Sequence, residues 1–210
     1  GNSFPNMDDQ KVGVKGYTSG ATLDLTDDRQ DPRNGNRIET ALYWSPKTDD
    51  LLTQFKTLDL NYTSYFPMRG HDTLVFNVFQ SQAIIDKKAT TDEAELRAKI
   101  GLGCAGMPDS PAKTSCLAAE NQVVQERIDY NTYGEATFIG GVQRLRSFQN
   151  GRYHAGNSLS YGAEYRWNIT DERTLMDIYI MRGIRTGIQA AFFLEQGTVS
   201  DNPARLWTAP

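Results

Sequence analysis

Cys104 and Cys116 are the residues of this chain whose types and spacing could support covalent chemistry with each other. They lie twelve positions apart in a stretch rich in Gly, Pro and Ser. Two cysteines are too few for a zinc site without histidine ligands, and His71 and His154 are far away in sequence. A disulfide is the favoured interpretation and is typical of an oxidising compartment. The alternative is two unrelated thiols in a cytosolic protein.

Motifs for enzymatic chemistry are missing from the sequence. It contains no Gly-rich phosphate loop, no nucleophile elbow and no metal-ligand cluster. Asp27, Asp28 and Asp31 lack the spacing of an EF-hand and fit a charged turn better. We therefore expect no catalytic residue, no cofactor and no metal ion, and we predict that the chain is not an enzyme.

Composition narrows the class of protein further. The 210 residues are 39% hydrophobic and 23% charged, and the formal net charge is −4. A pI near 5.2 argues against a dedicated nucleic-acid binder. No apolar run approaches the twenty or so residues of a transmembrane helix. Because the chain lacks an initiator Met and a signal segment, we expect an internal or processed piece of a longer protein.

Alternation of apolar and polar residues is the strongest structural signal, and it predicts about six long β-strands. The clearest case spans residues 157–169, where Glu164 lies on the polar face. A second case spans 185–197, with Glu195 on the polar face. Four shorter cases cover residues near 23–28, 37–44, 58–63 and 74–79.

The connections between these strands differ in length. Compact turns are expected at 31–36 and 68–72, which carry Pro, Gly and Asn. Residues 85–156 show no comparable alternation, so we expect one long inserted loop there. Short helices are expected within this loop, over 92–100 and 117–128.

Strands of about ten residues with one apolar face fit two kinds of protein. In a soluble barrel or sandwich the apolar face is the core. In an outer-membrane barrel it contacts lipid, and the polar face lines a wet lumen. Aromatic residues near strand ends, such as Trp44 and Trp167, resemble an interfacial girdle but could equally fill a core. The alternation leaves both possibilities open.

A loop motif precedes the strand at 157–169. Gly140 and Gly141 form a Gly-Gly pair, and Arg146 and Phe148 follow as an Arg-x-aromatic motif. Ser147 occupies the position between them. The motif leads through a Gly-Asn pair into the strand.

Three further motifs follow a consistent order with this one. Residues 27–35 form an Asp-x-Arg-x-x-Pro-x-x-Gly turn, Glu164 lies on the polar face of its strand, and residues 193–197 place Glu195 two positions before Gly197. Together the four motifs resemble the bacterial surface antigen family, the outer-membrane barrels of BamA, TamA and the two-partner secretion transporters.

This resemblance implies a fold and a role for each motif residue. The fold would be all-β: an antiparallel, up-and-down transmembrane β-barrel segment, with residues 1–210 supplying strands eight to thirteen of sixteen. The loop after Gly140 and Gly141 would fold into the lumen, where an unpaired guanidinium would be costly. Arg146, Phe148, Glu164, Glu195 and Gly197 would then lock it, although Ser147 stands where the family has Gly and Glu195 where it has Asp.

The resemblance also implies function and location. The chain would be the barrel part of an outer-membrane assembly, insertion or translocation factor, with its long loop extracellular and its short turns periplasmic. Its partners would be outer-membrane lipid, unfolded outer-membrane or secreted proteins, and periplasmic domains or accessory subunits. Two alternatives remain: a barrel anchor or export pore for a passenger such as a patatin-like lipase, and a soluble β-sandwich binding module.

Overall fold

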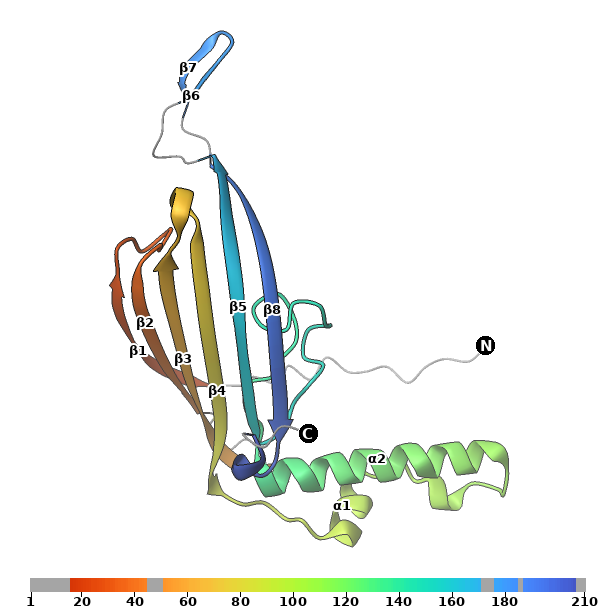
Figure 1. Cartoon of the computed structure of the whole chain (residues 1–210). Helices are drawn as coiled ribbons and strands as arrows, with labels where there is room; N and C mark the ends of the chain where they lie inside the picture. Colours follow the sequence, from red (N-terminus) through yellow and green to blue (C-terminus); the bar gives the residue numbers. More distant parts are fainter. Residues whose placement is uncertain (1–15, 45–50, 171–175, 185–186, 207–210) are drawn as a thin grey trace.

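Six strands form one antiparallel sheet in the computed structural model, which describes residues 16–44, 51–170, 176–184 and 187–206. Each strand lies beside its neighbour in the chain, as Figure 1 shows, apart from a hairpin inserted before the last strand. The strands are β1 (Tyr17–Thr26), β2 (Gly35–Trp44), β3 (Gln54–Pro67), β4 (Thr73–Lys87), β5 (Asn157–Thr170) and β8 (Ile188–Ser200). The predicted all-β, up-and-down order is therefore confirmed. Within the described residues the sheet is not closed, because β1 and β8 each pair with one strand.

The two faces of the sheet have opposite chemistry. We call the face that carries mid-strand charges the polar face, and it includes Asp59, Asn77, Glu164, Arg166 and Glu195. The other, the apolar face, includes Leu58, Leu60, Tyr62, Phe76, Val78, Tyr165, Trp167, Phe192 and Leu194. These apolar side chains are exposed, from 37% for Tyr165 to 80% for Leu194. The sheet thus presents its apolar face outward, the reverse of a sheet with an apolar core.

Helices occupy the first half of the long connection between β4 and β5. They are α1 (Glu93–Ile100), a short 3-10 turn η2 (Cys104–Gly106) and α2 (Pro111–Tyr133). α2 is longer than the sequence predicts. It begins at Pro111 because the Ser110 side chain accepts a hydrogen bond from the Lys113 backbone N–H, and it ends where Gly134 adopts φ +71°. The residues that extend α2 beyond the predicted helix, 111–116 and 129–133, are mostly small or polar, so they show little apolar periodicity.

The predicted disulfide between Cys104 and Cys116 is present, and it joins η2 to α2. Cys104 is fully buried. Beside it, the Glu120 carboxylate accepts hydrogen bonds from the Arg97 guanidinium at 2.8 Å and from the Cys104 backbone N–H at 3.2 Å. The bridge and this buried carboxylate hold α1, η2 and α2 together as one helical insertion.

Removing the disulfide should loosen the helical insertion without unfolding the sheet. A bridge that closes a loop of this length contributes about 3 kcal/mol by restricting the unfolded chain. In the Cys104→Ser, Cys116→Ser double variant we expect proteolytic cleavage to begin within residues 88–133 while β1–β5 and β8 stay protected. Mass spectrometry of the fragments tests this. Cleavage that starts in the strands would contradict it.

Acid should weaken the same insertion through Glu120. The Arg97 guanidinium, and then the Cys104 backbone N–H, hold the pKa of the Glu120 carboxyl below its usual range. Its stabilising contribution is therefore complete above the unfolded glutamate pKa of about 4.3 and is lost as the pH falls through the lowered folded pKa. Hydrogen exchange of the Cys104 amide, corrected for its intrinsic pH dependence, should accelerate across this window.

Two variants make the pH test specific. Glu120→Gln should remove the acid-dependent part of the Cys104 exchange, because the amide does not titrate. Glu126→Gln is the matched control, since the Glu126 carboxylate accepts a hydrogen bond from exposed Gln122 on the surface of α2. An exchange profile in Glu120→Gln that follows the wild-type profile would contradict the assignment.

Asn131 attaches the helical insertion to the end of the sheet. Its side chain is fully buried. The amide oxygen accepts a hydrogen bond from the Thr53 backbone N–H at 3.1 Å, and the amide nitrogen donates to the carbonyls of Leu51 and Thr90. Tyr130, one residue earlier, packs edge-on against Phe55 of β3. The last turn of α2 is therefore fixed to the connections that precede β3 and α1.

The β1–β2 and β3–β4 turns lie at the opposite end of the sheet from the helical insertion. Asp27 folds the β1–β2 turn by accepting hydrogen bonds from the backbone N–H groups of Arg33 and Asn34, as expected for a charged turn. The 3-10 turn η1 (Arg69–His71) joins β3 to β4 there, whereas η3 (Pro203–Arg205) follows β8 at the end that carries the helical insertion. β6 (Met176–Ile178) pairs with β7 (Met181–Ile184) as a separate hairpin.

Candidate functional site

Residues 134–156 form an inserted loop that follows the helical insertion and covers part of the polar face. Thr137 joins it to three adjacent strands. The Thr137 hydroxyl donates to Asp59 of β3 at 2.8 Å, its backbone N–H donates to the Ser81 hydroxyl of β4, and its carbonyl accepts from Ser158 of β5. Asp59 is 8% exposed. The mid-strand charge on β3 therefore binds the start of the loop.

A small apolar cluster lies beneath the loop, on the polar face. Phe79 of β4, Ile139 and Leu145 are its buried members, and Tyr153 and Val199 pack against it. Gly197 of β8 provides the floor, because a Cβ atom there would come within 2.7 Å of Ile139 Cδ1 and 2.8 Å of Leu145 Cδ1. Only a bare backbone at this position lets the loop approach so closely.

The Gly140–Gly141 pair gives the loop its turn. Both residues adopt the positive φ region, at +110° and +117°. A Cβ atom on Gly140 would lie 2.6 Å from the Gln149 carbonyl oxygen, and one on Gly141 would lie 2.5 Å from the Asn150 side chain. The Gly-Gly motif is therefore needed both for backbone conformation and for contact with the returning limb of the loop.

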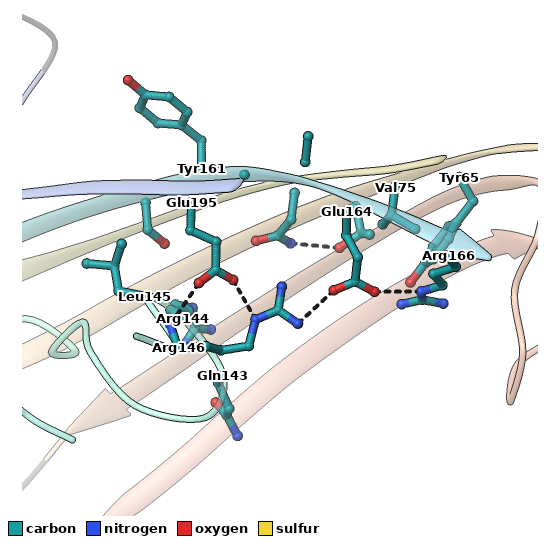
Figure 2. Close-up of a pocket in the computed structure, with 15 residues that line it drawn as sticks. Tyr65, Val75, Gln143, Arg144, Leu145, Arg146, Tyr161, Glu164, Arg166 and Glu195 are labelled. Atoms are coloured by element: carbon teal, nitrogen blue, oxygen red, sulfur yellow. Dashed lines mark hydrogen bonds and ion pairs between the residues drawn. The ribbon is translucent and has the colours of Figure 1, made fainter. Parts of the chain in front are cut away.

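Arg146 contacts both of the predicted carboxylates. Its Nε donates to Glu195 at 2.8 Å and its Nη1 donates to Glu164 at 2.7 Å, while its backbone N–H donates to the other Glu195 oxygen at 2.7 Å. Glu164 also accepts from Arg166 at 2.7 Å. Figure 2 shows the resulting alternation of charges, Glu195–Arg146–Glu164–Arg166, along the polar face.

This chain of charges is partly shielded from water. The side chains of Glu164 and Glu195 are 16% and 15% exposed, and that of Arg146 is 31% exposed. The Arg146 guanidinium also lies 3.8 Å above the ring of Phe193 on β8. Partial burial strengthens such contacts relative to a surface ion pair. All four carboxylate oxygens of Glu164 and Glu195 accept a hydrogen bond. We call Arg146, Glu164 and Glu195 the arginine latch.

Two motif residues behave differently from the latch. Phe148 packs edge-on against Tyr153 inside the loop and is 44% exposed. Ser147 does not need the positive φ that would favour the glycine of the family motif, because the left-handed residue is Leu145, at φ +50°. The strained position in this loop therefore lies two residues earlier than the motif suggests.

Sequence reasoning missed the residues that anchor the rest of the loop. Thr137 carries no motif, and only the mid-strand charge of Asp59 pointed to this part of the site. Arg144 was also missed, although it stands two residues before Arg146 and repeats its residue type. Cys104 and Cys116 belong to the helical insertion rather than to this site.

A cavity of 210 Å³ remains between the loop and the sheet. Figure 2 shows residues that line it. Arg144, Arg146, Arg166, Glu164 and Glu195 contribute to its lining. It has room for a few ordered water molecules, each taking about 30 Å³. Among the described residues no group of three or more His, Cys, Asp or Glu is placed to hold a metal ion. The arrangement is suited to holding the loop in place by fixed charges.

Comparison with known proteins found no match: no family model, no curated protein and no solved structure matches the chain. No helix in the part of the chain that the structure describes is long and apolar enough to cross a membrane.

Proposed function

We propose that this chain is part of a closed β-barrel in the bacterial outer membrane, belonging to a factor that assembles, inserts or translocates other proteins. The observation that carries the proposal is the inversion of the sheet. Its apolar face is exposed, whereas its charged face is covered by a loop that Arg146 holds. The resemblance of the loop and strand motifs to the bacterial surface antigen family supports the same function.

The dimensions of the sheet suit a membrane barrel. The two shortest strands, β1 and β2 with ten residues each, rise about 33 Å, which corresponds to about 25 Å along the axis of a barrel whose strands tilt by about 40°. The other four strands have 13–15 residues and would extend beyond the height that ten residues span. That height matches the apolar band of outer-membrane barrels, about 25 Å. Lipid would contact Leu58, Phe76, Trp167 and Leu194, whose exposure in water would otherwise favour aggregation. A soluble sandwich would need a second sheet over this face.

The proposed activity needs no covalent chemistry. The inserted loop and the latch stabilise the interior of the barrel, and unfolded outer-membrane or secreted proteins are the proposed substrates. Such substrates would be received elsewhere, at an openable seam whose unpaired backbone groups template new strand pairs. In the orientation that we propose for the barrel in the membrane, the helical insertion is extracellular and the turns at residues 27–34 and 68–72 are periplasmic. Periplasmic domains or accessory subunits are proposed as further partners.

A reconstitution experiment tests the function. The full-length protein, purified in detergent and placed in lipid vesicles, should accelerate the folding of a urea-unfolded outer-membrane barrel into those vesicles. Folding is followed by the change in electrophoretic mobility of the unheated substrate. Empty vesicles, and vesicles carrying an unrelated porin, are the controls.

Two results would contradict the proposal in different ways. A protein that stays monomeric in buffer without detergent would exclude the membrane barrel. A protein that enters vesicles but leaves the folding rate at the level of the porin control would retain the barrel and exclude the insertion activity. An export pore would then be tested by the release of an unfolded chain through the vesicle wall.

A further inference from the structure

Arg144 binds the sheet by a contact separate from the arginine latch. Its guanidinium carbon lies 3.4 Å from the centroid of the Phe79 ring on β4. Phe79 is 1% exposed and belongs to the buried cluster beneath the loop. A guanidinium stacked on an aromatic face at this distance is a cation–π contact, and it is strongest where water is excluded. The Arg144 side chain therefore covers the ring of the central aromatic residue of the cluster.

The ring, and not a carboxylate, is the principal partner of this guanidinium. In the described part of the chain, no carboxylate lies within ion-pair distance of Arg144. Asp59, Glu39 and Tyr43 interact with it only at longer range, through electrostatics. Both carboxylate oxygens of Asp59 already lie within hydrogen-bond distance of the Thr137 hydroxyl, which donates its single proton to this carboxylate. The contact consequently depends on the planar shape of the arginine and on the aromatic ring of Phe79.

Three consecutive loop residues reach three adjacent strands. Arg144 stacks on Phe79 of β4, and Arg146 pairs with Glu164 of β5 and with Glu195 of β8. Leu145 between them is 6% exposed and packs over Gly197 of β8. The order of strands in the sheet is β4, β5, β8. Figure 2 shows Arg144, Leu145 and Arg146 side by side against these strands.

We propose that Arg144 is a second positioning residue of the inserted loop, acting through Phe79, and that residues 144–146 tie β4, β5 and β8 into one rigid section of wall. If the chain is part of a barrel that opens, as the proposed function requires, its strands would separate outside β4, β5 and β8. The anchor itself requires only the contacts of the loop, so it can be tested without any assembly activity.

A spin label on the loop measures the anchor directly. Val142 is 90% exposed, and the described residues contain no free cysteine, so Val142→Cys gives one site for a nitroxide in the full-length protein. We expect a single immobilised spectral component. Adding Arg144→Met should raise the ratio of mobile to immobile label about tenfold. Phe79→Leu should have a similar effect, whereas Phe79→Trp should keep the label immobile because the aromatic face remains.

The double variant distinguishes a direct contact from two independent effects. If Arg144 acts through Phe79, the combination of Arg144→Met and Phe79→Leu should be no more mobile than either single variant. Arg152→Met is the matched control, because Arg152 lies in the same loop but 5.7 Å from the Tyr153 ring. Additive effects, or an Arg144→Met spectrum like that of Arg152→Met, would overturn the proposal.

The proposed function can fail independently of this result. An immobilised loop that Arg144→Met releases, in a protein without insertion activity, would retain the anchor and reject the function. Insertion activity in a protein whose loop label stays immobile in the Arg144→Met variant would retain the function and reject the anchor.

Discussion

Replacing Arg146 with methionine should detach the inserted loop and lower the free energy of unfolding by about 2–3 kcal/mol. The change leaves Glu195 with only the backbone N–H of residue 146 as a hydrogen-bond donor, while Glu164 keeps its ion pair with Arg166. Both carboxylates stay largely shielded from water. Removing one partner of a buried ion pair costs about 3–5 kcal/mol, and the partial exposure of Arg146 reduces that cost. Denaturant titration in detergent, followed by tryptophan fluorescence, measures the change.

Two variants calibrate this expectation. Arg146→Lys keeps the charge but cannot engage two carboxylates with a planar fork, so its effect should be intermediate. Lys99→Met breaks an exposed ion pair with Glu95, whose side chains are 48% and 43% exposed, and should cost less than about 0.5 kcal/mol. If Arg146→Met is no more destabilised than Lys99→Met, the latch contributes nothing beyond an ordinary surface contact.

The strands and their faces could be predicted from the sequence because side chains alternate with a period of two. In the strand at 157–169 the alternation places Glu164 on one face and Trp167 on the other, and the structure has the same assignment. The period does not say which face meets water. That question depends on what covers each face, and the covering loop has no periodicity of its own.

The long insertion was the least predictable part of the fold. α2 is capped by Ser110 and Gly134, whose roles are visible only once the helix between them is known. Its anchor, Asn131, binds backbone groups of residues 51, 53 and 90, which are distant in sequence. The hairpin of β6 and β7 was missed because seven residues of strand are too few to show alternation.

The candidate site was predictable only in part, and through a motif. The pairing of Arg146 with two glutamates follows from the resemblance, together with the strand faces that carry Glu164 and Glu195. Arg144 and Thr137 bind the sheet just as directly. Their partners, Phe79 and Asp59, are set by the path of the loop over the sheet, which no local pattern specifies.

Gly197→Ala should displace the loop through a steric clash, at a cost of about 1–3 kcal/mol. The new methyl group would lie 2.7 Å from Ile139 Cδ1 and 2.8 Å from Leu145 Cδ1. Neither side chain can withdraw freely, because Ile139 is 1% exposed and Leu145 is 6% exposed. The loop must therefore lift from β8, which weakens the neighbouring contact between Arg146 and Glu195. Denaturant titration and the mobility of a label at residue 142 should both report the change.

Ile139→Val provides the rescue for this clash. It removes the Cδ1 atom nearest to the new methyl group and by itself costs about 0.5–1.5 kcal/mol. In the Gly197→Ala background the same change should cost less, or restore stability, because it makes room for the methyl group. Gly106→Ala is the matched control, since no atom lies within 4 Å of a Cβ at that position. If Gly197→Ala and Ile139→Val simply add, the loop does not rest on Gly197, and close packing against β8 is not what holds it.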